Sequence, residues 1–226
     1  MLVIPVYNIL LAPDAVVYLE LDQLKKHSGG KGVALNERVI LIVLKDKISA
    51  AELAEDSFYP IGISGVIQEL NQNGYAAIRT QHRVNLDTVV IRPDHTVQLT
   101  ITKRAEINDL ADDVATEKLK NLLKEMDAFA DGFQWADVAK GYISQIHTIG
   151  AAASALSPWL KISNEDRYAI LAEDSVSKRT EKIEEVLYDF LEVGRITNEA
   201  VSLQQKEYQQ MYRESAIKKQ IEHLQK

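Results

Sequence analysis

The last quarter of the chain, residues 175–226, constrains the fold more than any other stretch. It contains no proline and a single glycine, Gly194. Apolar residues recur three or four positions apart along it, which is the repeat of an amphipathic helix. As one helix, about 50 residues would span roughly 75 Å at 1.5 Å per residue, and a compact domain of this size has no room to bury such a rod. We therefore predict a long helix whose first half packs on the body and whose second half projects.

The second half of this predicted helix carries a sparser apolar stripe. A narrow stripe suits contact with another helix, and a helix that is polar over most of its circumference is poorly stable alone. We expect this stripe to contact another copy of the chain or further domains. The helical pattern runs to the last residue without a stop signal, so we expect a docking or recognition module cut from a larger protein. The expected contact residues are Tyr208, Met211, Tyr212, Ile217, Ile221 and Leu224.

The composition is that of a globular protein and argues against several kinds of function. The chain has 226 residues, of which 46% are hydrophobic and 26% are charged, which suits one large domain or two small ones. It has no cysteine, which excludes a disulfide framework and a thiol nucleophile and fits a reducing cytoplasm. The net charge of −7 argues against sequence-independent binding to nucleic acid, which needs clustered Lys and Arg. The apolar N-terminus lacks a basic start and is interrupted by Pro5 and Pro13, so it resembles neither a signal peptide nor a membrane span.

From the N-terminus to about residue 102, the pattern is typical of short strands. The run 39–44, VILIVL, is continuously apolar, so we expect a strand buried on both faces. Asn73-Gly74 is a turn signal that predicts a hairpin over residues 61–79, and Gly62 and Gly65 inside its first strand indicate a bulge or bend. Short strands bent by glycines predict a small twisted barrel or half-barrel. The expected strands are 2–6, 16–21, 39–44, 61–70, 75–79, 84–91 and 97–101, with a short helix at 22–27 and a polar loop at 46–58.

After Lys103 the pattern becomes helical. We expect helices over 106–130 and 135–156, and a short helix to about residue 171 that opens with a capping box at Ser163. The long terminal helix follows. The sequence therefore predicts an α+β chain, in which a twisted β half-barrel is followed by a helical bundle that ends in a long projecting helix. We divide it into residues 1–104, 105–174 and 175–226.

No motif in the sequence predicts catalysis, a metal site or a phosphate site. In the loop Ser28-Gly29-Gly30-Lys31-Gly32, a glycine stands where a phosphate-binding loop needs Ser or Thr. Ser64 is followed directly by glycine inside a predicted strand, unlike the serine of a nucleophile elbow. The five histidines form no ligand pair, and the acidic cluster at 109–117 suits the start of a helix. We predict no catalytic residue, no metal ligand and no cofactor in this chain.

Three stretches together resemble the N-terminal region of the Lon family of ATP-dependent proteases. The opening Ile4-Pro5-Val6, followed by Ala12-Pro13, resembles the family's L-P-L strand and F-P loop. The segment 61–67, IGISGVI, is similar to the family's V-G-T-V-A-x-I strand. The end of the chain, from Arg213-Glu214 through IKKQI to LQK, resembles the R-E-Y-Y-L-R-E-Q-L-K-A-I-Q-K-E-L stretch that precedes the family's ATPase module.

This resemblance implies a PUA-like β-rich subdomain, a helical bundle and a long helix that leads into an AAA+ ATPase and a Ser–Lys peptidase domain. The present sequence contains no Walker A loop, so ATP and magnesium are expected only in the ATPase module. In such proteases the N-terminal region is associated with substrate recognition and hexamer assembly. The resemblance therefore implies a cytoplasmic, non-enzymatic module that binds unfolded or damaged proteins, contacts its own ATPase and protease domains and forms homo-oligomers.

Weak capture of unfolded proteins needs exposed apolar surface, and one loop offers a candidate for it. Ile9, Leu10, Leu11 and Pro13 lie between turn-forming residues, and we expect them to bind substrate; burial of the three aliphatic residues in the barrel is the alternative. Two other functions stay open. One is a free-standing adaptor of similar fold that binds peptides. The other is an RNA-binding module, since PUA-like folds often serve RNA, although the acidic balance argues against it.

Overall fold

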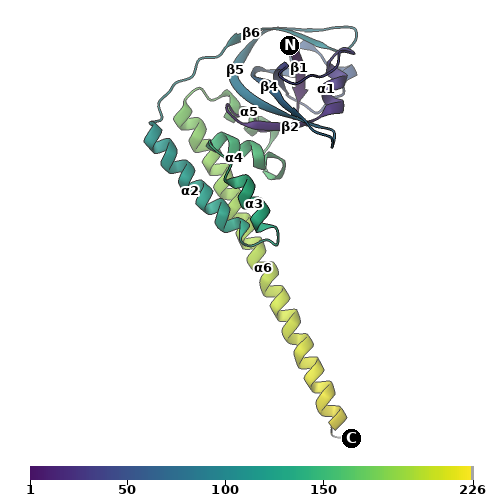
Figure 1. The fold of residues 1–226 in the computed structure, drawn as a ribbon, viewed down its shortest axis with the longest axis vertical. Coiled ribbons are helices and arrows are strands. Elements are labelled where there is room, and N and C mark those ends of the chain that lie inside the picture. The colour runs from purple at the N-terminus through teal and green to yellow at the C-terminus, as the bar shows by residue number, and fades with distance from the viewer. Residues whose placement is uncertain (225–226) are drawn as a thin grey trace.

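The computed structural model describes the backbone of residues 1–224 and the side chains of residues 1–211. A curled sheet forms one end of the molecule, a group of helices packs beside it, and the last helix projects far beyond both (Figure 1). That helix, α6 (Val176–Leu224), has 49 residues. The predicted α+β architecture with a long projecting helix is therefore confirmed.

The sheet has six strands in the order β1-β3-β4-β5-β2, and β6 pairs with β5. Only β1 and β3 pair in parallel; the other pairs are antiparallel. No pairing joins β1 to β2 among the residues that the structure describes, so the sheet is a half-barrel that does not close. The β half comprises β1 (Leu2–Val6), β2 (Val16–Glu20), α1 (Leu21–His27), β3 (Arg38–Leu44), β4 (Phe58–Leu70), β5 (Tyr75–Ile91) and β6 (Val97–Lys103), with short 3-10 turns at Ala50–Glu52 and Glu55–Ser57.

Glycines in β4 allow this sheet to curl. A Cβ atom on Gly62 would lie 2.6 Å from the carbonyl oxygen of Leu41, and one on Gly65 would lie 2.8 Å from that of Arg79. Both glycines thus sit where neighbouring backbones approach too closely for a side chain. The pairing of β4 with β5 also shifts register between Ile63 and Gly65, so the predicted bulge is confirmed.

Strand β3 is buried on both faces, as its apolar run predicted. Val39, Leu41 and Val43 belong to the core inside the curl of the sheet. Ile40, Ile42 and Leu44 belong to a second core on the other side, with Phe58 and Val97. Alternate side chains of one strand therefore join two separate cores.

The helical half contains α2 (Asp112–Ala130), α3 (Ala136–Ile143), α4 (Ile149–Leu156), a 3-10 turn (Ser157–Trp159), α5 (Asn164–Ala172) and the first turns of α6. Its core joins Leu122 and Met126 of α2 to Ile183, Leu187 and Leu191 of α6. Farther along α6 the apolar side chains of Val193, Ile196, Val201 and Leu203 are exposed. Only the first part of the long helix is buried, as predicted.

Two helix boundaries differ from the prediction. Helix α2 begins at Asp112 rather than at 106, because Ile107 is held in an extended bridge to Ser175. The predicted helix 135–156 is two helices, and Thr148 caps the second by accepting a hydrogen bond from the backbone N–H of Ala151 at 3.0 Å. In both places a contact or cap outside the helical repeat sets where the helix begins.

Strand boundaries also differ: β4 begins at Phe58 rather than at 61, and two predicted strands are joined. The predicted strands 75–79 and 84–91 form the single strand β5, which pairs with β2, β4 and β6 along its length. The polar residues Thr80 and Arg83 lie in the middle of this strand and are buried. Their side chains find partners outside the sheet, as described below.

The contact between α2 and α6 depends on Gly194, and Gly141 of α3 provides a matched control. A Cβ atom on Gly194 would lie 2.5 Å from Cε2 of Phe129, whereas one on Gly141 would meet no atom within 4 Å. Gly141→Ala should raise the free energy of unfolding by about 0.5–1 kcal/mol, because alanine favours the helix. Gly194→Ala should lower the free energy of unfolding by about 1 kcal/mol, because the overpacking against Phe129 costs more than alanine's helix preference contributes. Urea unfolding followed by circular dichroism measures both, and equal gains would show that the Phe129 contact is not tight.

Candidate polypeptide-binding surface

The loop that was expected to bind substrate is buried between the two halves of the molecule. Leu10 and Leu11 are both 0% exposed. Leu11 packs in the inner core of the sheet, and Leu10 packs in the core of the helical half. Ile9 and Pro13 are half-buried. The expectation of an exposed apolar surface is therefore wrong for the two leucines, because their side chains link the two cores. The alternative, burial in the barrel, holds fully for Leu11 and partly for Ile9, whereas Leu10 is buried in the helical half.

Hydrogen bonds fix this loop to both halves. The N–H of Asn8 donates to Oδ1 of Asn164 at 2.7 Å, and the N–H of Leu10 donates to Oγ of Ser157 at 2.8 Å. From the sheet side, Oγ1 of the buried Thr80 donates to the carbonyl of Ala12 at 2.6 Å. Buried backbone groups need such partners, so the loop is a structural connector.

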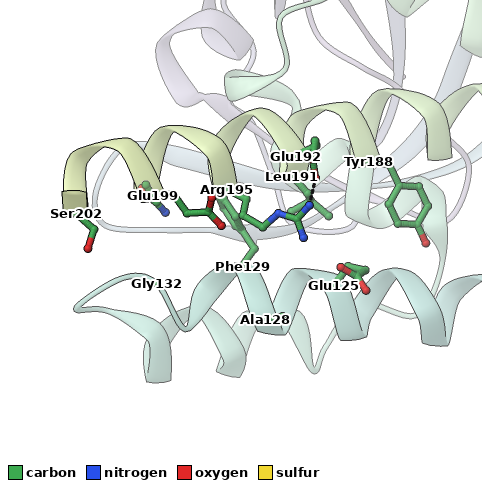
Figure 2. Close-up of a pocket in the computed structure, with 11 residues that line it drawn as sticks. Glu125, Ala128, Phe129, Gly132, Tyr188, Leu191, Glu192, Arg195, Glu199 and Ser202 are labelled. Carbon is green, nitrogen blue, oxygen red and sulfur yellow. Dashed lines mark hydrogen bonds and ion pairs between the residues drawn. The ribbon is translucent and has the colours of Figure 1, made fainter. Parts of the chain in front are cut away.

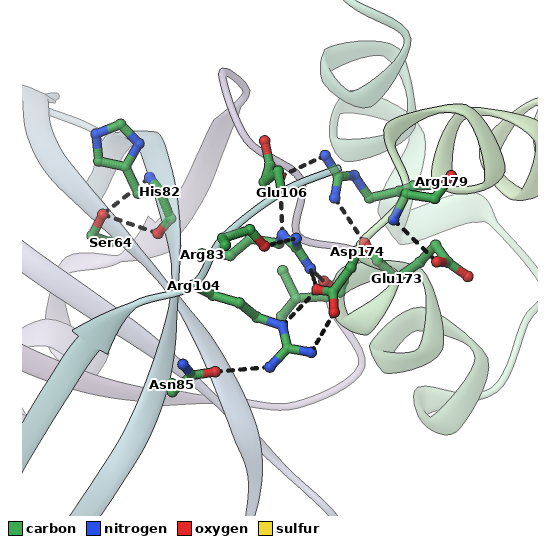
Figure 3. A network of polar contacts seen from close by, with 12 residues as sticks. Ser64, His82, Arg83, Asn85, Arg104, Glu106, Glu173, Asp174 and Arg179 are labelled. Atoms are coloured by element: carbon green, nitrogen blue, oxygen red, sulfur yellow. Dashed lines mark hydrogen bonds and ion pairs between the residues drawn. The ribbon is translucent and has the colours of Figure 1, made fainter. Parts of the chain in front are cut away.

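A second connection between the halves is ionic (Figure 3). The buried guanidinium of Arg83, on β5, donates to Glu106 and to Asp174, each at 3.0 Å. Arg104 donates to both oxygens of Asp174 at 2.6 and 2.7 Å, and Arg179 of α6 donates to Glu106 at 2.7 Å. Two carboxylates thus join arginines from the sheet, from the segment after β6 and from the start of α6.

Carboxylates also hold the start of α6 in place. The pKa of Asp174 is lowered, first by its hydrogen bond from Arg104, so the group stays ionised and balances the arginines. Asp109 accepts hydrogen bonds from Oγ of Ser175 at 2.6 Å and from the N–H of Ser177 at 2.9 Å. The Ser175 bond is the main cause of the lowered pKa of Asp109. Asp109, a member of the acidic cluster at 109–117, therefore caps α6. The sequence had predicted that this cluster stabilises the start of its own helix, α2.

The serine and the glycine-rich loop singled out in the sequence form local backbone contacts and turns. The hydroxyl of Ser64 bonds the backbone of His82 and not its ring. It donates to the carbonyl at 3.0 Å and accepts from the N–H at 3.1 Å. Gly29 and Gly30 adopt positive φ angles of 61° and 79° in the turn after α1. Within residues 1–211 no group of three or more His, Cys, Asp or Glu side chains lies close enough together to hold a metal ion. No helix in the described part of the chain is long and apolar enough to span a membrane.

An exposed apolar surface is present on α3. Trp135, Val138 and Tyr142, which we call the α3 face, are 55%, 62% and 71% exposed. The spacing of four residues places Val138 and Tyr142 on one side of α3, and Trp135 is the N-cap residue that precedes the helix. Phe133 stacks on Trp135 with ring centroids 4.8 Å apart, and Phe129 meets Phe133 edge-on at 5.0 Å. Aromatic rings thus extend from the α3 face toward α2.

A groove runs between α2 and α6, with a cavity volume of about 400 Å³ (Figure 2). This volume lies within the range of ligand pockets in proteins. Ala128, Phe129 and Leu191 give the α2–α6 groove an apolar floor, and Gly132 closes it at the turn between α2 and α3. Its other lining residues are Glu125, Tyr188, Glu192, Arg195, Asn198, Glu199 and Ser202. The sequence predicts none of these residues as a site, because the two sides of the groove lie far apart in the chain.

The predicted contact stripe on the distal part of α6 is described only in part. Tyr208 and Met211 are exposed on α6. The side chains of Tyr212, Ile217, Ile221 and Leu224 lie outside the described residues. The role of the stripe stays a prediction.

Comparisons with known proteins bear on the fold. No protein-family model matches the sequence, and no curated protein matches it. Among solved structures, the chain is similar to the N-terminal domain of Mycobacterium avium complex Lon protease, with a TM-score of 0.53 and 15% identity over 83% of this chain and 97% of that one. A Lon N-terminal domain protein from Xanthomonas campestris aligns with a TM-score of 0.45 and 14% identity over 83% of this chain and 96% of that one. The chain thus has the fold of a Lon N-terminal domain, and the predicted resemblance is confirmed at the level of the fold.

The ionic connection leads to a stability prediction for Arg83, with Arg92 as the control. Arg83→Met should lower the free energy of unfolding by about 2–3 kcal/mol, because it removes charged hydrogen bonds inside the protein. Arg92 is exposed and its side chain bonds only Gln98, so Arg92→Met should change stability by less than about 0.5 kcal/mol. Urea unfolding followed by circular dichroism measures both. If Arg83→Met is as stable as Arg92→Met, the connection does not hold the two halves together.

Proposed function

We propose that this chain is the N-terminal recognition and assembly module of an ATP-dependent Lon-type protease, and that it binds unfolded or damaged proteins. The likeness of its fold to the mycobacterial Lon N-terminal domain carries this proposal. ATP hydrolysis and peptide cleavage belong to an ATPase and a Ser–Lys peptidase domain, neither of which this sequence contains, and ATP and magnesium bind there. The module works in the cytoplasm. Residues 1–104 and 105–174 form its body, and residues 175–226 lead toward the ATPase.

The α3 face is the surface that supports a recognition role best. Unfolded proteins expose apolar side chains that a folded protein buries, and an exposed apolar patch binds them without requiring a defined sequence. Trp135, Val138 and Tyr142 offer two aromatic rings and an aliphatic side chain on one short helix. Aromatic residues contribute much of the free energy at binding surfaces. This surface replaces the buried loop at Leu10 and Leu11 as our candidate.

Removing apolar area from the α3 face should weaken the binding of unfolded protein. We expect Val138→Ser with Tyr142→Ser to raise the Kd for a labelled, permanently unfolded protein about tenfold, since roughly 1–2 kcal/mol of apolar burial is lost. Fluorescence anisotropy measures the Kd, and circular dichroism checks that the helix content is unchanged.

The control removes the same side-chain types from the β half. Tyr18 and Val90 are 62% and 46% exposed, and neither belongs to the helical half. Tyr18→Ser with Val90→Ser should leave the Kd within about twofold, which corresponds to less than about 0.5 kcal/mol. An equal loss of affinity in both double variants, or no loss of affinity in either, would show that the α3 face does not bind the unfolded protein.

The assembly role rests on the distal part of α6. Val201, Leu203, Tyr208 and Met211 are exposed there, and such a helix gains stability from a partner helix. We expect the full chain to self-associate at about 100 μM, where a standard interface of micromolar Kd is populated. A chain that ends at Leu203 should remain monomeric. Sedimentation equilibrium measures both, and a monomeric full chain would show that the stripe has no partner in a second copy.

A further inference from the structure

The α2–α6 groove has the length and shape of a site for a short peptide segment. Its lining residues on α6 run from Tyr188 to Ser202, with positions 188, 191, 195, 198 and 202 on one side of the helix. This stretch covers about 21 Å at 1.5 Å per residue. A groove between two packed helices that is open along its side is the kind of surface on which a third helix or an extended segment lies.

The floor of the groove is apolar and continues into the α3 face. Phe129 lies on the floor between the two helices (Figure 2), and its ring meets Phe133, which stacks on Trp135. Leu191 lines the groove from α6. Ring contacts therefore link the floor of the groove to the α3 face through the turn between α2 and α3.

The rim of the groove is acidic. Three carboxylates, those of Glu125, Glu192 and Glu199, face a single guanidinium, that of Arg195. Arg195 forms an ion pair with Glu192. Among the described residues no ion pair is formed by Glu125 or Glu199, and both are exposed. The pKa of the Tyr188 phenol, which lines the groove, is raised. Burial is the main cause, and the negative charges of Glu184 and Glu125 add to it.

We propose that the α2–α6 groove binds substrate segments in which apolar residues are flanked by Lys or Arg. The inference rests on the proposed function and specifies its substrate class. The apolar side chains of such a segment cover Phe129 and Leu191, and its cations lie near Glu125 and Glu199. Complementary charge selects among segments that are equally apolar, because a segment flanked by carboxylates is repelled. A second copy of this chain is an outcome that the test below distinguishes, since each copy carries a net charge of −7 but its residues 204–226 hold five Lys or Arg against three Glu.

Two peptides test the preference on the full chain. Both have 15 residues with Leu and Phe on one helical face; one has Lys at the flanking positions and the other has Glu. We expect the Lys peptide to bind at least about tenfold more tightly, because two favourable charge contacts become repulsive in the Glu peptide. In 1 M NaCl the two affinities should converge, because salt screens exposed charges. Equal affinities at low salt would overturn the proposal.

Three variants locate the binding to the groove. Glu125→Lys with Glu199→Lys should reverse the preference, so that the Glu peptide binds more tightly. Ala128→Trp should weaken both peptides, because the indole fills the floor. Asp189→Lys is the control: Asp189 is exposed on α6 but does not line the groove, so the preference for the Lys peptide should persist. A loss of preference in the Asp189 variant as large as in the double variant would show a general charge effect and overturn the proposal.

Competition separates this inference from the proposed function. If the Lys peptide displaces the unfolded protein, the recognition role and the groove proposal both hold. If the unfolded protein binds but the Lys peptide neither binds nor displaces it, the groove proposal fails and the recognition role stands. If neither ligand binds, both fail. If Glu125→Lys with Glu199→Lys changes the sedimentation of the full chain without changing peptide binding, the groove is a contact between copies and the proposal fails.

Discussion

The buried guanidinium of Arg83 is the constraint on which the arrangement of this molecule depends. A charge removed from water must be paired, and the penalty for leaving it unpaired is several kcal/mol. Its partners, Glu106 and Asp174, come from the segment after β6 and from the residue pair that precedes α6. Arg83 is therefore satisfied only when the sheet, this segment and the start of α6 meet in one geometry. That geometry sets the direction in which the long helix leaves the body (Figure 1).

The connector loop at residues 8–13 adds a second, largely apolar connection. Leu10 and Leu11 enter different cores, and Asn164, Ser157 and Thr80 bind the loop backbone. Two connections far apart in sequence resist both rotation and separation of the halves. The two connections therefore fix the helical half, which carries the surfaces proposed on α2, α3 and α6, against the sheet.

The sequence predicted the elements whose periodicity is strong, and failed where tertiary contacts decide. The apolar run of β3, the glycines of β4 and the repeat of α6 each follow from local physics. The start of α2 depends on the bridge from Ile107 to Ser175, and the burial of Leu10 depends on a helical core over 100 residues away. Neither leaves a periodic signal. The α2–α6 groove was missed for the same reason, although Gly194, the single glycine in the long helix, marks the position where Phe129 packs.

The two proposed surfaces differ in a way that suits the handling of long unfolded chains. The α3 face carries no charge, whereas the α2–α6 groove adds an acidic rim to an apolar floor. Phe129 lines the groove, Phe133 contacts it, and Trp135 of the α3 face stacks on Phe133, so the two surfaces are linked by contacting rings. Two weak sites on one body hold a polypeptide more tightly than either alone, because the second contact forms at a high effective concentration. Each contact still dissociates quickly, which allows the chain to be pulled away. A single tight site would instead release the bound segment slowly.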